Sequence, residues 1–172
     1  MDPLLTALFV VSRIVHIGTA IVAVGGTVFM RFILMPAASA ALSQADHDGL
    51  RARILGSWKK VIHGAILLFL LSGAVNYGRV IAQRTHSGDG LYHGLMGTKI
   101  LLAFAIFFIA SALVGKSPAF ASIRSNAKKW LTVNVLLAAV IVMISGTLRF
   151  RPERPRLPIP AATVNSTTNG NY

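Results

Sequence analysis

Cysteine is absent from this chain of 172 residues, and only five residues are acidic. Without cysteine the protein cannot form disulfides, thiolate metal sites, iron–sulfur clusters or covalently attached haem c. The sequence also lacks a Gly-rich phosphate loop, a Cys or Ser nucleophile motif, a His-Glu-x-x-His run and paired carboxylates inside an apolar stretch. These absences argue against a hydrolase, an ATPase or a carboxylate-driven proton pump.

Apolar residues dominate what remains. The chain is 54% hydrophobic and 13% charged, with a mean hydropathy of +0.65 and no polar stretch long enough for a separate soluble domain. This composition predicts an integral membrane protein with the lipid bilayer as its main partner. The net charge of +12 comes mostly from Lys and Arg that flank apolar stretches. Lipid headgroups explain that pattern, so we expect no nucleic-acid partner.

The lengths of the apolar stretches predict four membrane spans, since about 20 helical residues cross the roughly 30 Å hydrocarbon core. We place them at about 4–35, 58–82, 95–114 and 130–150. The fold class is therefore all-α, an integral membrane up-down four-helix bundle occupying residues 1–151.

Proline and polar residues predict where these helices stop. Pro36 should end the first span and Pro118 should follow the third, while Ser43–Gly49 and Thr85–Gly90 read as polar turns. Residues 152–172 contain several prolines and few apolar side chains, which predicts an extended, disordered tail.

Basic residues indicate the orientation. Nine lie in the connections after the first and third spans, against six on the other side. By the positive-inside rule both termini lie outside the cytoplasm, and we expect the bacterial inner membrane as the location.

Ionisable residues inside the apolar stretches are the best indication of function, because such groups are costly in hydrocarbon and usually face a cavity or a ligand. His63 lies in the second span, towards the side opposite the termini. The other polar groups share the leaflet nearer the termini, and none of them is a carboxylate. They are Arg13, His16, Asn76, Arg79, His93, Lys99, Ser145 and Arg149. Such a set of cations and neutral donors suits an anionic ligand, such as porphyrin propionates, a quinone oxygen or a phospholipid headgroup.

Helical angles refine this prediction, at about 100° per residue. His16 lies on the same face as Ala20, Ala23 and Thr27, where a flat macrocycle or another helix could approach. Gly18 and Gly25 fall on the opposite face, where we expect close helix packing. On the third span, Lys99 shares a face with Tyr92, Met96, Ala103 and Ala110, and His93 points about 120° away.

Three segments carry a resemblance to a known family. In Val15–Phe29, His16 is followed nine residues later by the pair Gly25-Gly26, and Pro36 follows. Leu71–Gly78 contains a Ser-Gly pair near the end of the second span, and Gly97–Ala103 places Lys99 early in the third. These features resemble the copper resistance D-type membrane proteins and their HemJ-like relatives over roughly residues 8–150.

The resemblance implies a four-helix membrane protein related to haem-binding membrane cytochromes. HemJ-like members bind haem b through the first-span His and oxidise protoporphyrinogen IX, with the third-span Lys also required. These roles would fall on His16 and Lys99. Copper resistance D-type members are instead associated with copper uptake.

Three hypotheses from different classes follow. In the first, the protein is a haem b-binding membrane redox protein, oxidising a porphyrinogen or passing electrons to a quinone. His16 is then an axial ligand and Lys99 a catalytic residue. Arg13, His63, Asn76 and Arg79 would help to bind the cofactor, with His63 as a second axial ligand if it reaches similar depth.

In the second hypothesis the protein binds or transports copper through His16, His93 and Met96. Taking the haem and copper hypotheses together, the candidate metal ligands are His16, His63 and His93. In the third it is a cofactor-free structural or assembly subunit of a homo-oligomer or a larger membrane complex.

Overall fold

The computed structural model describes residues 2–83, 86 and 89–150, and every regular element within them is helical. The predicted all-α class is therefore confirmed for the described part of the chain. The predicted tail, 152–172, and residues 85, 87 and 88 of the predicted turn at 85–90 lie outside the described residues. The elements are α1 (Pro3–Phe29), the π-helix η1 (Met30–Leu34), α2 (Met35–Ala41), α3 (Gln44–Gln83), α4 (Gly90–Val114), the 3₁₀ turn η2 (Pro118–Phe120), α5 (Ala121–Ser125) and α6 (Ala127–Arg149).

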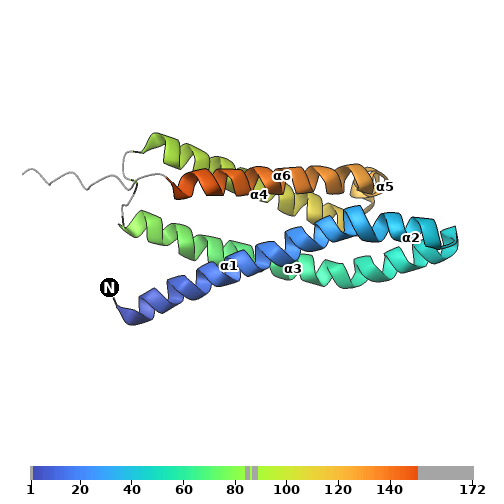
Figure 1. Cartoon of the computed structure of the whole chain (residues 1–172), viewed down its shortest axis with the longest axis horizontal. Coiled ribbons are helices and arrows are strands. Elements are labelled where there is room, and N and C mark those ends of the chain that lie inside the picture. The colour runs from blue at the N-terminus through green and yellow to red at the C-terminus, as the bar shows by residue number, and fades with distance from the viewer. Residues whose placement is uncertain (1, 84–85, 87–88, 151–172) are drawn as a thin grey trace, which may run out of the picture.

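Four long helices, α1, α3, α4 and α6, lie side by side, and consecutive ones run in opposite directions (Figure 1). Contacts join α1 to α3, α3 to α4, α4 to α6 and α6 back to α1, which closes the four into a bundle. The start of α1, the end of α3, the start of α4 and the end of α6 meet at one end, which we name the terminal end. The predicted up-down order is therefore present.

Local capping explains where α1 and α4 begin. The Asp2 carboxylate accepts a hydrogen bond from the Leu4 N–H at 2.9 Å, and Pro3 follows at the first helical position. The Asp89 carboxylate likewise accepts from the Tyr92 N–H at 3.1 Å. Each side chain satisfies a backbone donor that the helix leaves unpaired.

The prediction that Pro36 ends the first helix is wrong. The chain stays helical to Ala41, because η1 inserts a π turn just before the proline, and the Met35 N–H bonds to the Met30 carbonyl five residues earlier. A proline ring normally clashes with the carbonyl four residues before it. The wider turn changes the position of the preceding carbonyls, and Pro36 then stands in the first turn of α2.

The predicted polar turn at Ser43–Gly49 is also wrong, because α3 begins at Gln44 rather than near residue 58. Ser43 explains the difference: its hydroxyl donates to Asp46 Oδ2 at 2.6 Å and accepts from the Asp46 N–H at 3.3 Å. A serine followed three residues later by an acid caps a helix N-terminus. The polar residues of Ser43–Gly49 therefore belong to the capped first turn of α3 and not to a loop.

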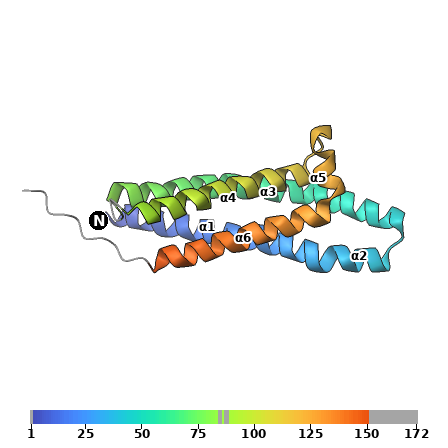
Figure 2. The ribbon, with the colours of Figure 1, turned by 90° about the horizontal axis from the view of Figure 1, so that it is seen from above.

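The helices differ in length. The continuous helical segments Pro3–Ala41 and Gln44–Gln83 have 39 and 40 residues, whereas α4 and α6 have 25 and 23. At about 1.5 Å per residue the first two are close to 60 Å long, about twice the hydrocarbon thickness. Figure 2 shows α2 and the start of α3 extending beyond α5 and α6. This part projects from the bundle at the end opposite the termini.

The outer surface of the bundle is apolar. All four helical segments are long and apolar enough to cross a membrane. Large apolar side chains point outward, with exposed fractions of 65% for Ile14, 67% for Ile21, 70% for Leu101 and 67% for Val142. The small buried core contains Ile62, Ala110 and Val114. An apolar exterior on this scale requires a lipid or protein partner.

One pair of helices packs closely through a glycine, although at a different position from those predicted. Gly18 and Gly25 have no other part of the protein within 4 Å of where a Cβ would stand. A Cβ on Gly26 would instead collide with the Trp58 ring on α3. Gly26 is therefore the residue that allows Trp58 to contact α1.

Candidate functional site

The candidate site is centred on His16, which lies half-buried on α1 and faces α3. His16 Nδ1 is 2.8 Å from the Ser72 hydroxyl oxygen, and Ser72 Oγ is 2.5 Å from the Leu68 carbonyl oxygen. A serine hydroxyl has one proton, and a carbonyl can only accept. Ser72 therefore donates to Leu68 and accepts from His16, which assigns the imidazole proton to Nδ1.

A second serine strengthens this contact between the helices. Ser12 lies one turn before His16 on α1, is 8% exposed, and donates to the Ser72 backbone carbonyl at 3.1 Å. Two side chains of α1 thus bond to one residue of α3. The ring orientation of His16 is fixed, and its Nε2 keeps a lone pair that no proton occupies.

An aromatic ring packs against this imidazole, and a lysine lies within electrostatic range of it. The Phe69 ring meets His16 edge-on at a centroid distance of 5.1 Å, and Phe107 from α4 lies 5.7 Å from Phe69. Lys99 on α4 is half-buried and lies close enough to His16 for their charges to interact. The structure therefore brings the two strongest candidates of the sequence, His16 and Lys99, into one neighbourhood.

The other predicted cofactor-binding residues divide into two groups. Asn76 and Arg79 are half-buried on α3, one and two turns beyond Ser72 towards the terminal end. The Arg79 guanidinium lies 5.0 Å from the centre of the Phe9 ring, and its Nε donates to Gln83 Oε1 at 3.3 Å. Arg13 is exposed on the outer surface of α1, where a long side chain can extend towards the headgroups.

His63 and His93 do not join His16. His63 precedes Ser72 by nine residues on α3, about 14 Å along the helix axis. Its exposed ring donates from Nδ1 to the Lys59 carbonyl of its own helix at 2.7 Å. His93 is also exposed, and its Nε2 donates to the His86 carbonyl at 3.2 Å. Of the three predicted metal-ligating histidines, the structure thus places His16 alone at this site.

Three features of this end of the bundle were missed by sequence reasoning. Ser72 accepts the hydrogen bond of His16 Nδ1, and Ser12 donates to the Ser72 carbonyl. The only signal for Ser12 was its position four residues before the histidine. The polar residues at the terminal end were expected to include no carboxylate. Asp89 lies at this end and is 4% exposed, so that expectation is wrong. The stacked pair His86 and Tyr92, with ring centroids 3.7 Å apart, lies beside it.

The donor set can be compared with the cofactors that the sequence suggested. Haem b needs an imidazole nitrogen free to bind iron, apolar surroundings and cations for its propionates. His16 Nε2, the Phe69 and Phe107 rings and Lys99 fit these needs. Copper sites generally need several nitrogen or sulfur ligands together. The described residues contain no group of three His, Cys, Asp or Glu that could hold a metal ion.

No protein-family model, no curated protein and no solved structure matches this chain significantly.

Proposed function

We propose that this chain is a multi-pass membrane protein that binds haem b through His16 and acts in electron transfer or in oxidation of a porphyrinogen. The carrying observation is the hydrogen bond from His16 Nδ1 to Ser72 Oγ at 2.8 Å. Histidines that ligate metals through one ring nitrogen commonly donate a hydrogen bond from the other, which fixes the tautomer and the ring orientation. Here Ser72 Oγ is the acceptor of that hydrogen bond, between α1 and α3.

The membrane setting follows from the exposed apolar side chains and the four helices of spanning length. The excess of Lys and Arg at the end of the bundle opposite the termini supports a cytoplasmic position for that end. Both termini then lie outside the cytoplasm, and the host membrane is the bacterial inner membrane. His16 would lie in the outer half of the bilayer.

Each residue near His16 has a role in this proposal. Lys99 provides a cation that can hold a propionate or a substrate carboxylate, and charge-assisted hydrogen bonds of this kind are the strong ones. Asn76 and Arg79 extend the polar side of the site towards the terminal end. Bound haem would supply one-electron chemistry, whereas the protein supplies position, electrostatics and exclusion of water. The resemblance to HemJ-like proteins agrees with this division of roles.

The first experiment is to purify the protein in mild detergent from haem-replete cells. Absorption spectra of the oxidised and dithionite-reduced protein, with iron and copper analysis, then test the proposal. A b-type reduced spectrum with stoichiometric iron is expected. Bound copper without such a spectrum would favour a copper protein, and a colourless, metal-free protein would favour a structural subunit.

Ser72→Ala should weaken haem binding while the helices stay paired. The variant removes the acceptor of His16 Nδ1, but Ser12 still donates to the backbone carbonyl at position 72. Loss of a hydrogen-bond partner to a metal-binding residue typically costs about 10–100-fold in affinity. Haem titration of the apoprotein measures the change.

Ser145→Ala is the matched control for this experiment. The sequence grouped Ser145 with the polar residues of this leaflet, but its hydroxyl donates to the Ile141 carbonyl of its own helix at 2.7 Å and bonds to no other helix among the described residues. It should bind haem like the wild type. Equal haem affinity in the Ser72 and Ser145 variants would contradict a positioning role for Ser72.

A further inference from the structure

A cavity lies at the end of the bundle opposite the terminal end. A cavity of about 360 Å³ opens where η1 and α2, the start of α3, the end of α4 and the start of α6 come together. It is separate from the His16 site, since its lining includes no residue that bonds to or stacks on His16. Nothing in the proposed redox function requires it.

One wall of this cavity is apolar. It adjoins the buried core cluster and includes the aromatic ring that packs on Gly26. This wall can accept acyl chain, because apolar surface removed from water or headgroups is stabilised by contact with hydrocarbon. Its main members are Leu55, Trp58, Ile62, Leu113, Val114 and Leu131.

The lining of the cavity also includes three cationic side chains. Arg31, Arg51 and Lys128 line the cavity, and no Asp or Glu does. Arg31 donates from Nε to the Lys128 carbonyl at 3.1 Å and to Thr132 Oγ1 at 2.9 Å. Its two terminal nitrogens make no hydrogen bond to a described residue, and the guanidinium lies 5.1 Å from the centre of the Phe32 ring. Three positive charges around one space repel each other, and an anion would relieve that repulsion.

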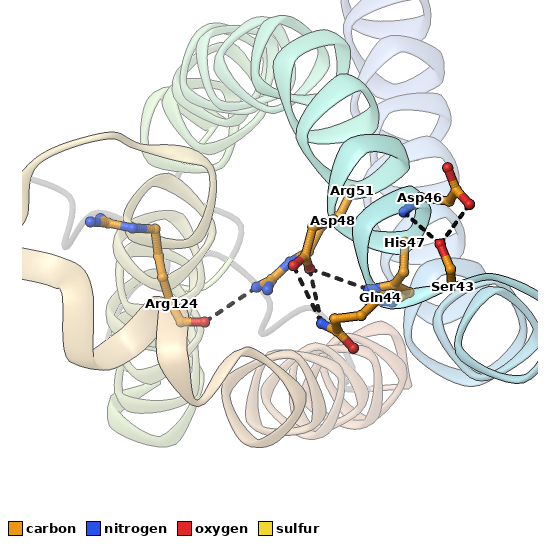
Figure 3. Close-up of polar contacts among 7 residues, drawn as sticks. All are labelled: Ser43, Gln44, Asp46, His47, Asp48, Arg51 and Arg124. Carbon is orange, nitrogen blue, oxygen red and sulfur yellow. Dashed lines mark hydrogen bonds and ion pairs between the residues drawn. The ribbon is translucent and has the colours of Figure 1, made fainter.

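Arg51 has a similar arrangement, visible in Figure 3. Its side chain points from α3 towards α5, where Nη2 donates to the Arg124 carbonyl at 3.3 Å. The nearby acids are engaged elsewhere: Asp46 bonds to Ser43, and Asp48 accepts from Gln44. Among the described residues the one ion pair joins His47 and Asp48, at 3.5 Å. Arg51 therefore forms no ion pair with a described carboxylate.

A buried amide gives an independent indication of a ligand. Asn134 lines the cavity, is only 6% exposed, and its Oδ1 has no hydrogen-bond partner among the described residues. Buried polar atoms are normally paired, and an unpaired one calls for an explanation. Asn134 lies on α6 about two turns deeper in the bundle than Lys128.

We propose that this cavity binds one anionic glycerophospholipid. The phosphate would contact Arg31, Arg51 and Lys128, the glycerol region would reach the Asn134 amide, and an acyl chain would lie along the apolar wall. Basic pockets between membrane helices on the cytoplasmic side are a known type of site for anionic headgroups. A small soluble anion would leave the apolar wall and Asn134 without contacts.

Titration of the delipidated full-length protein in detergent tests this, with Trp58 in the wall as a fluorescent reporter. The ligands are phosphatidylglycerol, phosphatidylcholine with the same acyl chains, and inorganic phosphate. We expect saturable binding of phosphatidylglycerol only. Arg51→Gln and Arg31→Gln should each weaken it about five-fold, from about 1 kcal/mol per basic residue at a membrane surface.

Arg53→Gln is the matched control, because Arg53 is exposed on the same helix and does not line the cavity. It should bind like the wild type, and Arg51→Lys should recover most of the affinity. If Arg51→Gln does not fold, Lys128→Gln is measured in its place. That variant should fold, because the Lys128 side chain makes no hydrogen bond to the described residues.

Three results would overturn the proposal. Equal binding of phosphatidylcholine would show that charge plays no part, and an equal response to inorganic phosphate would indicate a small-anion site. Identical affinities for the Arg51 and Arg53 variants would place the lipid elsewhere. Haem content should be unchanged in all these variants, so failure here leaves the proposed function untouched.

Discussion

His16→Ala is expected to purify with a tenth of the wild-type haem or less. Even the loss of an outer hydrogen-bond partner commonly costs about 10–100-fold in metal affinity, and this substitution removes the proposed iron ligand itself. The protein should still fold, because Ser12 continues to bond to Ser72 and the remaining contacts between α1 and α3 are untouched. The ratio of haem absorbance to protein after purification measures the effect.

The control is His63→Ala, which removes an exposed histidine that bonds only to its own helix. That variant should retain full haem content. Imidazole added to His16→Ala should restore part of the spectrum, because the free ligand can occupy the space of the missing ring. Full haem content in His16→Ala, or equal losses in both variants, would rule out His16 as the axial ligand.

Gly26→Ala is expected to destabilise the protein by about 1–3 kcal/mol, the usual range for overpacking a close contact. The added methyl group would collide with the Trp58 ring, which is held between α1 and the core cluster of Ile62, Ala110 and Val114. Either the ring or the helix must move. Unfolding in a detergent titration, followed by helical circular dichroism, gives the change in free energy.

The neighbouring residue supplies the control. Gly25→Ala adds the same methyl group one position earlier, where nothing else lies within 4 Å. Alanine also favours the helix over glycine by up to about 1 kcal/mol, so this variant should be neutral or slightly more stable. A Gly25 variant as unstable as the Gly26 variant would exclude the Trp58 contact as the cause.

The sequence predicted the helices better than their ends. Apolar length predicted four long helices, because a long hydrophobic run has few alternatives to a helix. The predicted ends of the third and fourth, 114 and 150, lie within one residue of Val114 and Arg149. The errors at Pro36 and at Ser43–Gly49 share a cause. Both segments contain residues that usually stop helices, and the π turn and the serine cap that accommodate them depend on local geometry.

The candidate site was predicted only in part. His16 and Lys99 are conspicuous because ionisable residues are rare within apolar spans, and the structure brings them close together. The bond to Ser72 could not be predicted, because the rotation and register of α3 against α1 decide which of its residues faces the histidine. Arg31, Arg51 and Lys128 were attributed to lipid headgroups in general, since composition does not show that helix ends gather them around one cavity.

The π turn at Met30–Leu34 also affects how this chain could vary by insertion or deletion. A π turn takes up one residue more than an α turn before its hydrogen bond closes. Removing one residue from it would therefore restore the regular α spiral and leave α2 close to its present rotation relative to α1, so that Met35, Pro36 and Ser39 keep facing the cavity. Pro36 would then meet the carbonyl four residues before it, because the wider turn that accommodates its ring is gone. A deletion elsewhere in α1 would instead turn the projecting end by about 100° relative to the membrane part of the helix.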